Sequence, residues 1–152
     1  MAVYVVRHAK AGDRDTWEGS DRLRPLSKPG WLQAEGLAER FKGVAMQAIL
    51  SSPYLRCIQT VEPLARQQGL RVEQEKGLAE GAGGASLRRL AQRFQGKNAT
   101  FCTHGDVIDE LLVGLAADGL VPRSRLGAEK GSTWVLEETD GRITGAQHIP
   151  AP

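Results

Sequence analysis

An uninterrupted apolar run near the N-terminus, Val3-Tyr4-Val5-Val6, leads directly into Arg7 and His8. Because no polar residue alternates with these β-branched and aromatic side chains, the run is typical of a strand buried on both faces, as at the centre of a parallel sheet. Open α/β sheets bind their ligands beyond the carboxyl ends of the strands. The segment therefore predicts that Arg7 and His8 lie at a ligand site, and the positive charge there points to anion chemistry.

Strand and helix patterns alternate along most of the remaining chain. Apolar runs predict further strands at 48–52, 70–73 (weak and peripheral) and 99–103. Periodic apolar residues predict four helices. The first starts at Ser27 and stops at Gly43, and the second opens at Pro53 and ends at Gly69, with a kink or restart at Pro63. The third has Ser86 as its cap, and the fourth starts at Asp106. This alternation indicates an α/β sandwich with a mainly parallel central sheet flanked by helices.

The C-terminal part of the chain has a different pattern. Trp134-Val135-Leu136 and Ile143 flank Asp140-Gly141, a dipeptide typical of a tight β-hairpin turn. We therefore expect the last two strands to be antiparallel. At 152 residues, with no linker or repeat, the chain is expected to form one domain, 1–152.

The composition excludes several classes of function. The longest apolar run is too short to span a bilayer, and the N-terminus lacks the apolar core of a signal peptide, so we expect a cytoplasmic protein with no membrane partner. Cys57 and Cys102 lie in apolar segments and are expected to be buried thiols. Twenty Lys and Arg against 18 Asp and Glu leave a net charge of +2, which is too even to indicate a nucleic-acid partner.

Positive charge is nevertheless concentrated just after the first strand. Arginine and lysine gather there at Arg7, Lys10, Arg14, Arg22, Arg24 and Lys28. The polar loop 10–26 that carries most of them is long, and long loops within a compact domain are often functional. We expect Arg14 and Arg22 to pair with acidic residues of the same loop.

Two later segments bring further candidate residues to the same edge of the sheet. His104 follows the predicted strand 99–103, and Arg56 lies in the first turns of the helix after the predicted strand 48–52. Because parallel strands end at one edge, we expect both to share a pocket with Arg7 and His8. Guanidinium groups match phosphate oxygens, helix N-termini add backbone donors, and a histidine can attack phosphorus and take the phosphoryl group covalently.

These segments resemble the motifs of the histidine phosphatase superfamily, in the branch that includes the phosphoglycerate mutases. Arg7-His8 resembles its nucleophile motif, Ser52-Pro53-x-x-Arg56 with Gln59-Thr60 its arginine motif, and Thr103-His104-Gly105 its second-histidine motif. The resemblance covers nearly the whole chain. The short length, the Arg24-Pro25-Leu26-Ser27-x-x-Gly30 segment and the lack of a large inserted cap resemble the SixA-type phosphohistidine phosphatases, and the segment 102–108 is also similar to phosphatase domains attached to some Nudix hydrolases.

The resemblance implies a three-layer sandwich and a role for each motif residue. His8 is expected to be the nucleophile, neutral when it attacks, with its other ring nitrogen donating to a backbone carbonyl. Arg7, Arg56 and His104 are expected to hold the phosphoryl oxygens. An acidic residue in the family's corresponding loop donates a proton, which makes Glu80 the candidate general acid.

Three further residues are expected to contact the substrate: Lys10, Arg24 and Gly105. The chain departs from the family where glycine usually follows the Arg-His pair, because it has Ala9 there. One additional methyl group is tolerable unless the backbone needs a positive φ at that residue. Lys10, Ala11 and Gly12 also replace the polar residues that hold phosphate in the mutases, which weakens a mutase interpretation.

We therefore expect a metal-independent phosphatase that works through a phosphohistidine intermediate and needs no cofactor. Protein phosphohistidine is the expected substrate because a pocket without a cap is open to a protein surface, and a nucleotide or other small phosphorylated metabolite is the alternative. A non-catalytic phosphate-binding regulator is an alternative of another class. A metallohydrolase built on His8, His104 and Asp106 is disfavoured, because the nearby arginines would repel a dication.

Overall fold

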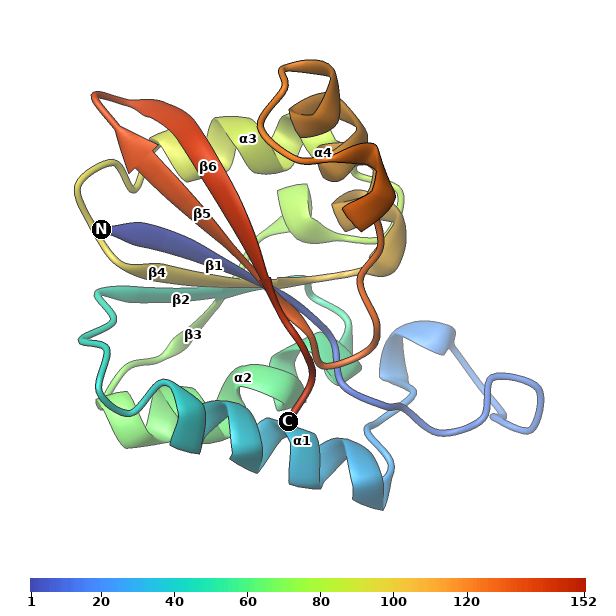
Figure 1. Cartoon of the computed structure of the whole chain (residues 1–152). Helices are drawn as coiled ribbons and strands as arrows, with labels where there is room; N and C mark the ends of the chain where they lie inside the picture. Colours follow the sequence, from blue (N-terminus) through green and yellow to red (C-terminus); the bar gives the residue numbers. More distant parts are fainter.

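A six-stranded, mainly parallel sheet forms the centre of the computed structural model, which describes residues 1–152 (Figure 1). The strand order is β3-β2-β4-β1-β5-β6. The strands are β1 (Ala2–Arg7), β2 (Ala48–Ser51), β3 (Val72–Gln74), β4 (Ala99–Thr103), β5 (Thr133–Thr139) and β6 (Arg142–Ile149). The first four are mutually parallel, whereas β5 runs antiparallel to both β1 and β6. The prediction of a mainly parallel sheet with an antiparallel C-terminal hairpin is confirmed.

Helices cover both faces of the sheet, so the molecule has three layers. In Figure 1, α1 (Lys28–Arg40) and α2 (Leu55–Gln68) lie on one face, and α3 (Gly84–Gln92) and α4 (Gly105–Ala117) on the other. Successive side chains of a strand point to opposite faces. Accordingly, Val5 belongs to the apolar core under α3 and α4, and Val6 to the core under α1 and α2. Burial on both sides explains why the β1 sequence is apolar throughout.

Local sequence signals explain most of the helix ends. The Ser27 hydroxyl accepts a hydrogen bond from the Gly30 N–H at 3.2 Å and caps α1 as expected. Gly69 closes α2 in a left-handed conformation with φ of +69°. At the tip of the β5–β6 hairpin, Asp140 and Gly141 both have positive φ, as a tight two-residue turn requires.

Of the kink or restart expected at Pro63, the restart is absent, because α2 is continuous and buried Val61 and Leu64 hold it against the sheet on either side of the proline. One cap prediction is wrong. Ser86 does not cap α3, which begins at Gly84 without a side-chain cap. Packing fixes that start instead, because a Cβ on Gly84 would lie 2.5 Å from the backbone nitrogen of Leu111 in α4.

Cys57 and Cys102 are both buried and free, as expected. None of the helices combines the length and the apolar character that crossing a membrane would need.

Candidate active site

The pairing of β1 with β4 brings the two histidines together. Arg7 is in register with Thr103, and the His8 N–H donates to the Thr103 carbonyl at 3.1 Å. His104 follows one residue later as the N-cap of α4. The ring centroids of His8 and His104 are 5.5 Å apart. The parallel register therefore places one histidine from each central strand on the same edge of the sheet.

The His8 ring is held in one tautomer. Its Nδ1 lies 2.8 Å from the Ala9 carbonyl oxygen, which can only accept, so Nδ1 carries the proton and Nε2 keeps its lone pair. Burial, together with the positive charges of Arg56 and other neighbours, lowers the pKa of His8 to about 3. A neutral imidazole with a free nitrogen is the form that can act as a nucleophile.

Ala9 fits the site without backbone strain. Asp140 is the one non-glycine residue with a positive φ, so the backbone at Ala9 does not require glycine. The Ala9 N–H donates to Thr60 Oγ1 at 2.9 Å, and its methyl group packs in a small cluster with Leu26 and Ala34. The departure from the family's usual glycine leaves the geometry of His8 intact.

Arg7 lies against the N-terminus of α4. Its Nη1 donates to the Ala128 carbonyl at 2.7 Å, whereas its buried Nε has no hydrogen-bond partner. A Cβ on Gly105 would lie 2.9 Å from Arg7 Cζ, so only glycine leaves room for the guanidinium there. Gly105 therefore serves this site by its lack of a side chain, and it also lines the adjoining cavity.

Arg56 is completely buried, and Asp21 holds it in place. Its Nη1 donates to the Asp21 carbonyl at 2.9 Å, and its Nη2 lies 3.1 Å from Asp21 Oδ2. The guanidinium also lies under the ring of Tyr54, 4.9 Å from its centroid. Both Nε and Nη2 are buried without an aligned hydrogen bond, but Nη2 is ion-paired with Asp21, so Nε is the donor that remains free for an anion.

His104 is buried beside the same groups. Its Nε2 lies 2.8 Å from Ser52 Oγ and 3.5 Å from Cys57 Sγ. The ring packs edge-on against Tyr54 with centroids 4.7 Å apart. Its Nδ1 is buried without a hydrogen-bond partner.

Arg7, His8, His104 and Gly105 border a cavity of about 610 Å³, whereas Arg56 is not among its lining residues. Four basic and four acidic side chains line this cavity. Its lining includes Arg7, His8, Ala11, Gly12, Asp13, Arg14, Arg24, Glu80, His104, Gly105, Asp106, Asp109 and Lys130. Burial and the charges of the surrounding arginines lower the pKa of Lys130. A site in which cations destabilise one another in this way favours the binding of an anion.

The other predicted residues lie in different places. Arg24 lines the cavity, but its Nε donates to Asp21 Oδ1 at 2.9 Å and its Nη1 to the Gly12 carbonyl at 2.6 Å. Lys10 is exposed and does not line the cavity. Its backbone is instead bonded at the start of α1, where its N–H donates to the Gln33 side chain and its carbonyl accepts from the Ser27 N–H. These contacts give both residues a part in shaping the loop.

Glu80 lies at the rim of the cavity, where the structure brings it close to the arginines. Its Oε1 is 3.7 Å from Arg14 Nη2 and 3.8 Å from Arg56 Nη2. The adjacent Gly81 N–H donates to Asp106 Oδ2 at 2.8 Å, which ties this loop to the first turn of α4. The carboxyl group is therefore within reach of a group leaving the cavity.

Sequence reasoning missed two charged residues of this region: Asp21, which pairs with Arg24 and Arg56, and Lys130, which lines the cavity. Asp21 was expected only as a surface partner of the loop arginines. Burial alone would raise its pKa, but the hydrogen bond from Arg24 and the charges of Arg56 and Arg14 outweigh burial and hold the pKa below its ordinary value. Lys130 lies in a loop near the C-terminus, and no motif in the sequence pointed to it.

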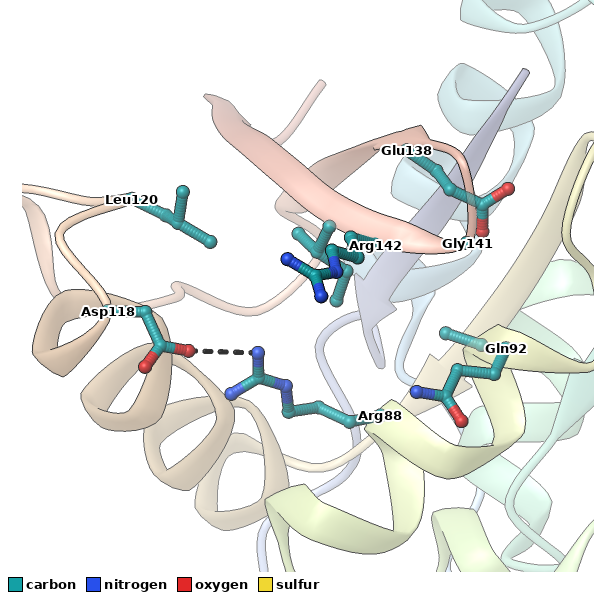
Figure 2. A pocket seen from close by; sticks show the side chains of 9 residues that line it. Arg88, Gln92, Asp118, Leu120, Glu138, Gly141 and Arg142 are labelled. Atoms are coloured by element: carbon teal, nitrogen blue, oxygen red, sulfur yellow. Dashed lines mark hydrogen bonds and ion pairs between the residues drawn. The ribbon is translucent and has the colours of Figure 1, made fainter.

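Another cavity, of about 330 Å³, lies at the far end of α4 beside the β5–β6 hairpin (Figure 2). Figure 2 shows Arg88 and Arg142 in its middle, with Arg88 bonded to Asp118 at 3.0 Å. It contains neither histidine nor any of the motif residues.

No group of three or more His, Cys, Asp or Glu side chains is arranged to hold a metal ion, and this includes His8, His104 and Asp106.

The fold and these side chains define an α/β protein with a neutral histidine beside guanidinium groups at the carboxyl edge of its parallel sheet, an arrangement suited to an anion. The model of the histidine phosphatase superfamily (branch 1) matches residues 3–87, and the chain belongs to this family.

Known proteins resemble the chain along its whole length. The 8-oxo-(d)GTP phosphatase of Mycolicibacterium smegmatis is 36% identical over 99% of the chain, and the chain spans 48% of that protein. Among solved structures, the protein histidine phosphatase SixA in complex with tungstate matches with a TM-score of 0.74 and 21% identity, covering 99% of this chain and 96% of that one. A mycobacterial glucosyl-3-phosphoglycerate phosphatase matches with a TM-score of 0.72 and 16% identity, covering 97% and 96%. At these identities the two structures support the fold.

Proposed function

We propose that this chain is a phosphatase that transfers a phosphoryl group to His8 and then hydrolyses the phosphohistidine. One observation carries the proposal. Five buried side-chain polar atoms lack a hydrogen-bond partner, and four of them belong to Arg7, Arg56 and His104 around the free Nε2 of His8. Buried donors without partners are costly, so their clustering here points to an anionic ligand.

The first step makes one bond and breaks another. His8 Nε2 attacks phosphorus with its lone pair, and the bond between phosphorus and the leaving atom breaks with its electrons on that atom. Donors from Arg7, Arg56 and His104 hold the phosphoryl oxygens as charge is redistributed, which supplies most of the catalysis. In the second step water attacks the phosphorus, the P–N bond breaks, and inorganic phosphate and neutral His8 are released.

Two substrate classes fit this site. Protein phosphohistidine fits because no helical cap covers the cavity of about 610 Å³, which leaves room for a protein surface. Nucleoside phosphates are the second class, and the 36% identity to a protein named 8-oxo-(d)GTP phosphatase favours them. Both use the same covalent step, so the proposal of phosphohistidine chemistry stands independently of the choice.

Trapping the intermediate tests the mechanism. Brief incubation with radiolabelled phosphoramidate, followed by denaturation, is expected to leave an acid-labile, alkali-stable label on His8. His8→Ala should abolish both the label and turnover, whereas His148→Ala, which removes a histidine outside the cavity, should leave both unchanged. A label on a serine or on His104 would contradict the proposal. Binding of phosphate without any turnover would favour a non-catalytic regulator.

Metal independence has its own test. Activity should survive exhaustive treatment with a chelator, and vanadate should inhibit, because its trigonal bipyramidal form resembles the transferring phosphoryl group. Loss of activity on chelation with recovery on addition of zinc or magnesium would contradict a purely histidine-based mechanism.

A further inference from the structure

A second cavity lies beside the candidate active site, on the other side of Tyr54. It has a volume of about 480 Å³ and is lined by Arg22, Pro53, Tyr54, Gln74, Lys76 and Ala79. Tyr54 forms part of the wall between the two cavities, because its ring packs against His104 and Arg56 of the active site. Ala79 directly precedes Glu80, which lines the active-site cavity. A substrate whose phosphoryl group lies at His8 therefore has this second cavity next to it.

The side chains of this cavity combine flat surfaces with free positive charge. The Arg22 guanidinium lies over the Tyr54 ring, with Cζ 5.5 Å from its centroid. Neither Arg22 nor Lys76 has a carboxylate within 4.0 Å, and no acidic residue lines the cavity. Guanidinium planes and phenol rings stack with planar heteroaromatic groups, and the Gln74 amide adds both a donor and an acceptor.

We propose that this cavity is a leaving-group subsite that binds the nucleoside part of a nucleoside phosphate. The inference rests on the proposed phosphatase function and selects between its two substrate classes. A nucleoside diphosphate presents a planar base for Arg22 and Tyr54 and a second, negatively charged phosphate for the unpaired cations. The imidazole that leaves from a phosphohistidine is neutral and would leave those cations without a partner.

The chemistry of such a substrate is consistent with this site. His8 Nε2 forms a bond to the terminal phosphorus while the bond from that phosphorus to the bridging oxygen breaks. The electron pair stays on the bridging oxygen, and a nucleoside monophosphate departs as an anion without needing a proton. Its base would remain in the subsite until water has hydrolysed the phosphohistidine.

A matched pair of substrates tests the subsite. Guanosine diphosphate and methyl diphosphate contain the same P–O–P bond and differ in the group that would occupy the second cavity. We expect wild-type protein to have a higher kcat/KM for guanosine diphosphate, and this preference to fall about tenfold in Tyr54→Leu and in Arg22→Gln, as loss of a stacking contact predicts. Tyr54→Phe should retain it because the ring remains. Arg71→Gln, which removes an exposed arginine outside both cavities, is the matched control.

A binding measurement separates failure of the subsite from failure of the phosphatase function. Calorimetric titration with guanosine monophosphate should give a dissociation constant about tenfold weaker for Tyr54→Leu than for wild type, whether or not turnover occurs. An unchanged substrate preference and unchanged binding in the variants would overturn the subsite while leaving phosphohistidine chemistry intact. Hydrolysis of a phosphohistidine peptide but not of guanosine diphosphate would also overturn it. Failure of any substrate to label His8 would instead contradict the proposed function.

Discussion

Ser52 Oγ lies 2.8 Å from His104 Nε2 and accepts a hydrogen bond from the Tyr54 N–H at 3.2 Å. We assign the hydroxyl as the donor to His104 Nε2, because it already accepts one hydrogen bond from the backbone and its proton is then free for the imidazole. That contact places the imidazole proton on Nδ1, the buried atom without a partner. In this arrangement Ser52 orients His104 so that its Nδ1–H can donate to a phosphoryl oxygen.

Replacing Ser52 with alanine should remove this control of the tautomer. With Nε2 no longer held as an acceptor, His104 can place its proton on Nε2 and present a lone pair to the phosphoryl oxygens. We expect kcat to fall by at least about tenfold, with the loss of about a hundred- to a thousandfold typical of removing one oxyanion donor as the upper range, while KM changes less. Steady-state kinetics with an aryl phosphate provide the measurement.

Ser51→Ala is the matched control for this prediction. Ser51 is equally buried and is the last residue of β2, directly before Ser52, but its hydroxyl donates to the Ser52 carbonyl and does not bond to His104. An equal fall in kcat for both variants would mean that the loss comes from packing of the strand and not from the tautomer of His104.

Replacing Arg56 with lysine should cost much of the activity although the charge is retained. Lysine cannot reproduce the planar fork whose Nη1 and Nη2 contact Asp21 while Nε remains free. Loss of one donor to a developing oxyanion typically costs about 2.7–4 kcal/mol of activation free energy. A kcat/KM near that of wild type would show that the Arg56 guanidinium does not contact the phosphoryl group.

Much of the fold could be predicted because its signals are local. The apolar β1 and β4 sequences, the Ser27 cap and the Asp140-Gly141 turn each specify their structure within a few residues. The continuity of α2 through Pro63 and the missing Ser86 cap have one cause. At both positions packing between elements distant in the sequence overrides the local preference, and the sequence order alone does not reveal that packing.

The site could be predicted only where its residues follow the strands. Arg7, His8 and His104 come together because β1 and β4 are adjacent and parallel. The position of Lys130 depends on how a loop of no regular structure folds back onto Arg7, and no periodic pattern encodes that path. Likewise, Lys10 was expected in the cavity by its position in the sequence, but its backbone bonds with α1 instead.

The lowered pKa of His8 should make stability depend on pH. Between the ordinary pKa of 6.5 and the folded value of about 3, the unfolded chain binds a proton at His8 that the folded chain does not bind. The free energy of unfolding should therefore fall as the pH falls through this window, by up to about 1.4 kcal/mol per pH unit. Urea denaturation from about pH 6.5 to pH 5, above the titration of most carboxylates, measures this slope.

His8→Gln removes the titrating group and should flatten the slope by that amount. His148→Gln is the control, because this histidine is partly exposed beside Glu129 and lies outside the cavity. Equal slopes for wild type and His8→Gln would mean that the folded and unfolded chains bind the His8 proton equally, and that burial does not lower the pKa of His8.

The last prediction concerns Glu80 and the proton that a poor leaving group requires. The arginines of the site stay protonated and cannot supply one, whereas the Glu80 carboxyl lies at the rim of the cavity, 3.8 Å from Arg56 Nη2. Glu80→Gln removes the acid but keeps the size of the side chain. We expect hydrolysis of an alkyl phosphate to slow by about a hundredfold, within the usual range for general acid catalysis. An aryl phosphate, whose phenolate leaves without a proton, should slow far less.

Glu110→Gln gives the matched control, since this glutamate belongs to α4 and does not line the cavity. The ratio of the two rates is the informative quantity, because the loss of charge beside Arg14 and Arg56 alters phosphate binding for both substrates alike. A constant ratio would remove Glu80 from the role of general acid and leave it as a partner of the arginines. If wild type shows almost no activity on alkyl phosphates, its substrates must carry leaving groups that depart unaided, and a nucleoside diphosphate is one of these.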